Sequence, residues 1–215
     1  MSNSKTQRKP PATAAERRDP TRRIRLDRTE RRQTLLDAGA KAFAKGGFQG
    51  TAMEAVAKNA GITRLIIYRH FESKDELYRA VLDRAVDGLR DAVTTKLAEG
   101  RTVASVVKGF LGAARKDPDG FKLLVRYSAH EPDFRDYSER FREGAVGAAQ
   151  DLISARVPDP VLRAWAAQTL LALLEEATLA WIENGEKSRD AEMTAVLTSS
   201  IDAMLGAFSG DRRPK

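Results

Sequence analysis

Apolar residues recur every three or four positions along most of the chain, which is the spacing of one face of an α-helix. After residue 27 the repeating positions are Leu35, Leu36, Ala42 and Phe43, and the sequence KGGF at 45–48 ends the run. The same spacing predicts helices over about 28–45, 51–59, 63–70, 74–98, 102–116, 121–130, 134–152, 161–184 and 191–208. No segment shows the strict alternation of a strand. The chain is therefore predicted to be all-α, with about nine helices.

Three pairs of residues have the spacing of a capping box, in which a side chain accepts from the backbone three residues on and a carboxylate reaches back. The pairs are Asp27 with Glu30, Thr51 with Glu54, and Ser73 with Glu76. Each pair stands where an apolar run begins. Together they predict helix starts near residues 28, 51 and 74.

The charge is concentrated at one end of the chain. Residues 1–50 hold 13 lysines and arginines against 5 acidic residues, whereas residues 101–215 hold 16 against 17. Residues 1–27 are basic, contain three prolines and lack apolar periodicity, so they are predicted to form a disordered arm. Such asymmetry suggests that the N-terminal part binds a polyanion. The alternative is a basic tail that only keeps the protein soluble.

Composition excludes several classes of protein. The 215 residues include no cysteine and only two histidines, so neither disulfides nor thiolate metal sites are expected. No apolar run is long enough to span a membrane, and no export signal is visible, which predicts a cytoplasmic protein. The chain also lacks a P-loop, a dinucleotide fingerprint and a nucleophile elbow. We therefore expect neither an enzyme nor a bound cofactor or metal.

The segment at 53–70, MEAVAKNAGITRLIIYRH, has the pattern of a helix-turn-helix unit. Such a unit needs a small residue where its helices touch and a residue that tolerates positive φ in its turn. Ala57 and Gly61 meet these needs. The residues expected to face the core are Val56, Ala60, Ile62 and Ile67. This set, directly behind the basic segment, predicts DNA binding.

Helical geometry divides the second helix of this unit into two faces. At about 100° per residue, Ile67 points into the core with Phe71, and the opposite face is turned outward. On the outward side and its flanks, Arg64 has the chemistry to pair with guanine, and Leu65 or Ile66 to pack on thymine methyl groups. Phosphates are the expected partners of Tyr68, Arg69 and His70. The alternative is that Leu65 and Ile66 bury against a neighbouring helix.

The stretch from Thr29 to Leu82 resembles the N-terminal domain of the TetR family of transcriptional regulators. The matching features are Phe43 and Gly47 at a helix end, Thr51, the AGIT turn, Tyr68 followed by HF, and the sequence SKDEL. The resemblance implies phosphate contacts by Thr51, Tyr68, His70 and Lys74, and base contacts by Thr63, Arg64 and Leu65. Leu65 departs from the family, where this residue is commonly small. For Lys74, a merely solvated side chain is the alternative.

The basic arm contributes three further candidates for DNA contact, Arg22, Arg23 and Arg25. Similar arms enter the minor groove of DNA. They can equally give salt-dependent affinity without sequence preference, and that interpretation is slightly favoured here.

In this family the C-terminal helices form a ligand pocket, and the last two pair across a two-fold axis. The apolar residues that predict such a dimer are Leu170, Leu174, Ala177, Leu197, Ile201, Met204, Leu205 and Phe208. The candidate pocket residues are Phe110, Tyr127, His130, Phe134, Tyr137, Phe141 and Trp165. Ordinary core packing is the alternative for the pocket residues. A ligand is expected to be largely apolar.

These observations predict an arm at 1–27, a helix-turn-helix DNA-binding domain at 28–73, a connecting helix at 74–98 and a ligand-binding and dimerisation domain at 101–210. The predicted function is a homodimeric repressor that binds a near-palindromic operator and is released by a small-molecule effector. Two alternatives stay open. One is an architectural or sequence-tolerant DNA-binding protein without a ligand, and the other is a regulator that senses a protein partner.

Overall fold

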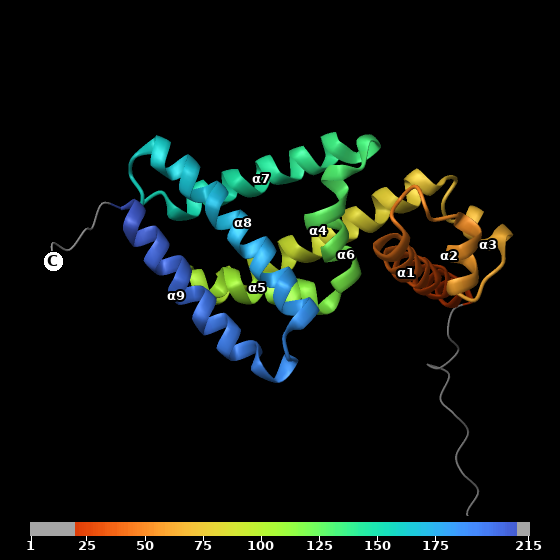
Figure 1. Cartoon of the computed structure of the whole chain (residues 1–215). Helices are drawn as coiled ribbons and strands as arrows, with labels where there is room; N and C mark the ends of the chain where they lie inside the picture. The colour runs from red at the N-terminus through yellow and green to blue at the C-terminus, as the bar shows by residue number, and fades with distance from the viewer. Residues whose placement is uncertain (1–19, 210–215) are drawn as a thin grey trace, which may run out of the picture.

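The computed structural model describes residues 20–209, with side chains from residue 28 onward. This part of the chain is built of α-helices and short helical turns and contains no strand (Figure 1). The α-helices are α1 (Pro20–Gly46), α2 (Met53–Asn59), α3 (Arg64–Tyr68), α4 (Lys74–Glu99), α5 (Val103–Lys116), α6 (Pro118–Lys122), α7 (Arg135–Ile153), α8 (Pro160–Asn184) and α9 (Asp190–Phe208). A π-helical turn (Leu123–Tyr127) and 3-10 turns (Ser128–His130, Pro132–Phe134 and Lys187–Arg189) complete them. The predicted all-α class is confirmed.

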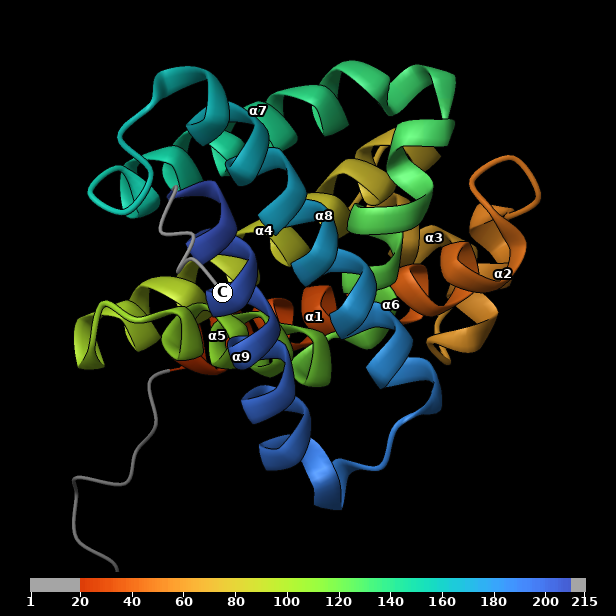
Figure 2. The same cartoon turned by 60° about the vertical axis from the view of Figure 1, so that its left-hand side comes forward.

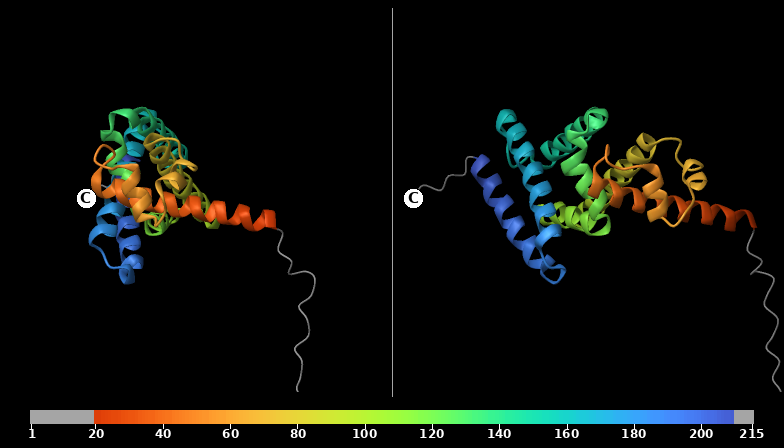
Figure 3. Two further views of the ribbon diagram at one scale, coloured as in Figure 1. Left: turned by 90° about the vertical axis from the view of Figure 1, so that its right-hand side faces the viewer. Right: turned by 45° about the vertical axis from the view of Figure 1, so that its right-hand side comes forward.

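The first helix begins earlier than the sequence predicts. Helix α1 starts at Pro20, and proline suits a first helical position because its fixed φ and missing N–H cost nothing there. Residues 20–27, which were expected in the arm, are therefore helical, and Asp27 lies within the helix instead of capping it. Figure 3 shows the start of α1 extending away from the rest of the molecule. Residues 1–19 of the predicted arm lie outside the described residues.

The capping box predicted at Ser73 is confirmed. Its hydroxyl accepts from the Glu76 N–H at 3.1 Å, and the Glu76 carboxylate accepts from the N–H of Glu72 at 2.6 Å, one residue earlier than expected. The box predicted at Thr51 is wrong, because α2 begins after Ala52 and has no side-chain cap. The sequence pattern thus located the start of α4 but not the cap of α2.

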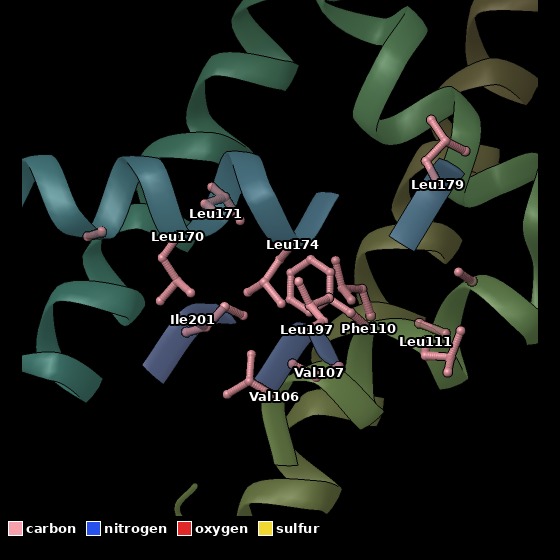
Figure 4. Close-up of a cluster of buried hydrophobic side chains, with 14 of the residues drawn as sticks. Val106, Val107, Phe110, Leu111, Leu170, Leu171, Leu174, Leu179, Leu197 and Ile201 are labelled. Atoms are coloured by element: carbon pink, nitrogen blue, oxygen red, sulfur yellow. The ribbon is translucent and has the colours of Figure 1, made fainter. Parts of the chain in front are cut away.

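Buried apolar side chains form two cores. The N-terminal core includes Leu36, Phe43, Val56, Ile67, Phe71, Leu77, Tyr78, Leu123 and Phe134. The C-terminal core lies mainly between α5, α8 and α9, and Figure 4 shows its side chains pointing toward one another. Between residues 20 and 209, no helix is both long and apolar enough to cross a membrane.

Helix α4 belongs to both cores. Leu77, Tyr78 and Val81 on its first half pack in the N-terminal core, while Ala85 and Leu89 pack in the C-terminal core. The helix runs for 26 residues without a break, and Figure 1 shows it passing from α1–α3 to the other end of the molecule. A tilt of α4 therefore moves one core relative to the other.

A second connection comes from the turns between α6 and α7. Phe134 is fully buried, and its ring centroid lies 4.9 Å from that of Phe48 and 4.4 Å from that of Tyr78. The carboxylate of Glu131 accepts a hydrogen bond from the Phe48 N–H at 3.1 Å. The C-terminal half thus supplies side chains that complete the N-terminal core.

The turn between α2 and α3 depends on Gly61. Its φ is +68°, a conformation that strains any residue with a Cβ. The Gly61 N–H donates to Lys58 O, and the Ile62 N–H donates to Ala57 O, which is the bond pattern of a Schellman motif. This turn fixes the angle at which α3 leaves α2.

Gly61→Ala is expected to lower the free energy of unfolding by about 1–2 kcal/mol, because alanine at positive φ is strained. Gly144→Ala on α7 is the matched control, since open space surrounds the added methyl group there. That change is expected to stabilise by about 0.5–1 kcal/mol. Urea denaturation of both variants measures the difference, and an equal effect of the two changes would contradict the role of Gly61.

Candidate nucleic-acid interface

Helices α2 and α3 form the predicted helix-turn-helix unit. Val56, Ala57 and Ile67 are buried in the N-terminal core, and Phe71 is buried beside them, as the sequence predicts. With these side chains inside, the opposite face of α3 is turned to solvent. Figure 1 shows α3 at the end of the molecule farthest from α9.

The outward face of α3 combines cationic, aromatic and apolar groups. Leu65 is 63% exposed and Tyr68 is 38% exposed, and Thr63, Arg64 and Arg69 are exposed as well. Leu65 therefore does not pack against a neighbouring helix, whereas Ile66 is half-buried. A major groove offers a partner to each kind of group here, namely base edges to guanidinium groups and thymine methyl groups to an apolar side chain.

Arg64 is held in place by two neighbours. Its Nε lies 3.1 Å from a carboxylate oxygen of Glu54 in the first turn of α2. Its guanidinium carbon lies 5.4 Å from the centroid of the Tyr68 ring, within the range of a cation–π contact. The guanidinium is thus oriented before any partner binds.

Thr51 is not on the outer surface. The residue is 6% exposed, and its hydroxyl lies 2.7 Å from Gly47 O and 3.2 Å from Ala42 O, where it donates to backbone carbonyls. The predicted phosphate contact of this hydroxyl is not what the structure shows. Thr51 instead fixes the turn from the end of α1 to the start of α2.

The ammonium group of Lys74 makes two contacts within the fold. Its ammonium group donates to Phe48 O at 2.9 Å and lies 4.3 Å from the centroid of the Phe48 ring. One of its three N–H donors is therefore used internally. The predicted phosphate contact stays a prediction for the others.

His70 lies beside a cluster of arginines on α1. Burial lowers the pKa of its imidazole, and the charges of Arg28, Arg31 and Arg32 lower that pKa further. The imidazole is therefore largely neutral at pH 7.

The three exposed arginines Arg28, Arg31 and Arg32 add positive charge to the interface and were missed as individual site residues. The excess of basic residues at 1–50 was the signal that pointed to them. The side chains of Arg22, Arg23 and Arg25 lie outside what the structure describes.

The seven side chains predicted to line a ligand pocket are not brought together. The C-terminal core holds Phe110 and Phe141, the N-terminal core holds Phe134 and Tyr127, Tyr137 contacts both, and His130 and Trp165 are exposed. The prediction failed because aromatic composition along the chain does not tell which core a side chain enters.

Two cavities occur elsewhere in the described residues. The larger, of about 680 Å³, lies between α1, α4 and the junction of α5 with α6, and charged side chains such as Arg84, Asp83 and Lys116 line it. The smaller, of about 320 Å³, lies between the start of α5, the end of α7, and α8 and α9. Its wall is mainly apolar, with Arg101 and an Arg156–Asp202 ion pair among its polar groups. None of the seven predicted residues lines either cavity.

The predicted dimer residues also need correction. Five of them are buried within the chain's own C-terminal core, namely Leu170, Leu174, Leu197, Ile201 and Leu205. They are covered because α8 and α9 both pack on α5. Ala177, Met204 and Phe208 are half-buried against the same core. The five buried side chains therefore build the core of the protomer, and the predicted dimer contact of Ala177, Met204 and Phe208 stays a prediction.

The exposed apolar residues of α8 and α9 lie on other faces. Val161 is 76% exposed, Trp165 and Val196 are each 62% exposed, and Leu162 is also exposed. The Trp165 ring packs edge-on against Phe208 at 5.0 Å between centroids, which joins the start of α8 to the end of α9. Figure 2 shows α8 and α9 together on one side of the molecule.

Comparisons with known proteins agree with this architecture. Residues 35–81 match the model of the family described as bacterial regulatory proteins, tetR family. The HTH-type transcriptional activator FasR of Mycolicibacterium smegmatis is 32% identical over 194 residues, which cover 86% of each chain. The HTH-type transcriptional repressor KstR of Rhodococcus jostii is 27% identical over 194 residues, covering 86% of this chain and 87% of that protein.

A solved structure extends the likeness to the fold. The TetR-like transcriptional regulator from Rhodococcus sp. RHA1 superposes with a TM-score of 0.71 at 22% identity, covering 82% of this chain and 96% of that one. The matched segment at 35–81 contains the whole helix-turn-helix unit and the first turns of α4. The chain thus belongs to the tetR family of bacterial regulatory proteins and is a DNA-binding transcriptional regulator.

Proposed function

We propose that this regulator is a homodimeric repressor that places α3 of each protomer in a major groove of a near-palindromic operator. We further propose that a small, largely apolar ligand in the C-terminal half releases it from DNA. One observation carries the DNA-binding part of the proposal: Arg64, Leu65 and Tyr68 are exposed on α3 while Ile67 anchors the helix in the core. An α-helix fits the major groove, and each of these groups has a base-edge or phosphate partner there.

In the proposed complex the side chains divide into two sets. Arg64 pairs with guanine O6 and N7, and Leu65 packs on a thymine methyl group, so these two specify sequence. Tyr68, Arg69 and His70 bind phosphates and fix the position of α3 in the groove. The α1 arginines beside His70 lengthen the positively charged surface along the DNA backbone.

The outer faces of α8 and α9 support a dimer. Val161 and Trp165 on α8 and Val196 on α9 each present apolar surface that this chain leaves in water, and pairing of these helices about a two-fold axis would cover it. Two protomers paired there carry their α3 helices at the opposite ends, where two half-sites of an operator would meet them.

The apolar cavity of about 320 Å³ is the proposed effector site. Its volume is at the lower end of the range for ligand pockets. Thr198 belongs to its wall, and the Thr198 hydroxyl is buried without a hydrogen-bond partner among residues 20–209. A largely apolar ligand with one hydrogen-bonding group matches this lining.

The route from this cavity to α3 runs through α4. The cavity touches residues 101–104, directly after the end of α4 at Glu99. Arg84 on α4 also pairs with Asp37 of α1 and Asp117 at the start of α6. A ligand that shifts the start of α5 would tilt α4 and change the separation of the two α3 helices. Lower affinity for the operator follows as a shift of population.

Activation is the second candidate, favoured by the name of the FasR relative, a transcriptional activator. KstR is named a repressor. Both candidates share the dimer and the operator contacts. They differ in whether the bound protein blocks or recruits RNA polymerase, which a reporter gene behind the operator measures.

Arg64→Ala is expected to weaken binding to a duplex selected from a random pool by roughly 1–3 kcal/mol, because the paired guanine loses its partner. Binding to a random duplex is expected to change much less. Arg69→Ala, the control for a phosphate contact, is expected to weaken both alike and to lower the salt slope by about one. Fluorescence anisotropy over a range of salt concentrations measures these effects, and equal losses on both duplexes for Arg64→Ala would refute its base contact.

Val196→Glu is expected to give a monomer of 23.7 kDa where the unchanged protein sediments at twice that mass, because each protomer would bury an unpaired carboxylate in the proposed interface. Ala148→Glu, on the exposed face of α7, is the control and is expected to leave the mass unchanged. Analytical ultracentrifugation of the unchanged protein and both variants measures these masses. A monomeric unchanged protein would end the dimer proposal.

Thr198→Leu narrows the proposed effector cavity and is expected to raise by about tenfold the concentration of ligand needed to release DNA. Alkanols and alkanoates of increasing chain length serve as probe ligands. Thr94→Leu, exposed on α4 outside the cavity, is the control. Anisotropy of labelled operator measures release, and an identical response of both variants and the unchanged protein would exclude this cavity.

A further inference from the structure

A negative charge on a DNA-binding surface requires an explanation, and Glu54 supplies such a charge. It lies in the first turn of α2, half exposed, with its carboxylate 3.1 Å from the Arg64 Nε. DNA presents phosphates to the whole interface, so an unpaired carboxylate there would oppose binding. In the first turn of α2 the carboxylate stabilises the helix dipole, and it is at the same time directed at an arginine.

Glu54 does not cap α2. The N-cap residue of this helix is Ala52, and no side chain accepts from its first N–H groups. The hydroxyl of Thr51, the expected partner in a capping box, is turned toward carbonyls of the preceding turn. The carboxylate of Glu54 extends instead to the next helix, to the first residue of α3.

The contact leaves the base-pairing edge of Arg64 available. The ion pair uses Nε, and the Tyr68 ring covers one side of the guanidinium. Among the described residues, no further partner engages the two terminal Nη groups. A bidentate pair with guanine O6 and N7 needs two N–H groups in a fixed plane, and the two neighbours restrict that plane.

We infer that Glu54 is a positioning residue that determines specificity: it directs Arg64 to a guanine edge and discourages the same guanidinium from binding phosphates. Without the carboxylate, the exposed arginine is free to turn to the nearest phosphate of any sequence. With the carboxylate present, Arg64 must give up its ion pair with Glu54 before it binds a phosphate. On a wrong sequence the binding free energy gained from that phosphate is therefore small. Specificity therefore rises through a penalty on non-cognate DNA. The inference rests on the proposed role of α3 in the major groove.

The test compares three variants with the unchanged full-length protein. Glu54→Gln keeps the shape of the side chain and removes its charge, and Glu54→Asp keeps the charge. Asp75→Asn removes one exposed carboxylate from the first turn of α4, away from Arg64, and controls for net charge alone. Each protein selects duplexes from a random pool, and anisotropy then measures its affinity for the selected and a random duplex.

For Glu54→Gln we expect several-fold tighter binding to the random duplex, a salt slope larger by about one, and loss of the guanine preference at one position of each half-site. Asp75→Asn is expected to change both affinities by the same factor and to keep the preference. Glu54→Asp is expected to keep most of the preference. Thermal unfolding is expected to be alike for Glu54→Gln and the unchanged protein, which separates positioning from folding.

Two results would overturn the inference. One is a Glu54→Gln protein with the same selected sequence and the same ratio of affinities as Asp75→Asn. The other is an Arg64→Ala, Glu54→Gln double variant whose loss of specificity equals the sum of the single losses, because a positioning residue has no effect once the residue it positions is gone. If the unchanged protein selects no sequence, the proposed function fails as well, and that outcome is distinct from both.

Discussion

The packing of Phe134 against both Phe48 and Tyr78 is the contact on which the relation between the two cores depends. It brings a side chain from the C-terminal half into the centre of the N-terminal core, where it is fully buried. Glu131 binds the backbone of Phe48 at the same place. Because packed interiors do not deform continuously, the DNA-binding helices cannot shift without a response from this segment. The helix-turn-helix unit thus shares its core with side chains from the C-terminal half.

Helix α4 is a second connection between the two cores. Its first half packs with α1 and its second half packs with α5, so the two ends of one stiff element lie in different surroundings. Arg84, midway along it, joins carboxylates on both sides. In the proposed mechanism, a shift at the start of α5 would reach α3 through α4 and through the turns that carry Phe134. These two connections favour a rigid-body response over local unfolding.

The exposed apolar side chains at the two ends of the molecule have different surroundings. Leu65 stands among cations and a phenol, a mixture suited to a polyanion with methyl groups in its groove. Val161 and Val196 are exposed on the two long helices α8 and α9, and such apolar side chains suit contact with another protein surface. This difference is the physical basis for the proposal that DNA binds at α3 and a second protomer at α8 and α9.

The sequence by itself determined the helical class, the turn at Gly61, the buried position of Ile67 and the start of α4 at Ser73. All of these follow from spacing within a few residues, which is set by local backbone geometry. Only the tertiary structure decided that Leu170 and Ile201 are buried within one chain, that Phe134 lies in the N-terminal core, and that the Thr51 hydroxyl turns inward. Periodicity tells that a helix has an apolar face, but contacts between distant segments determine what covers it.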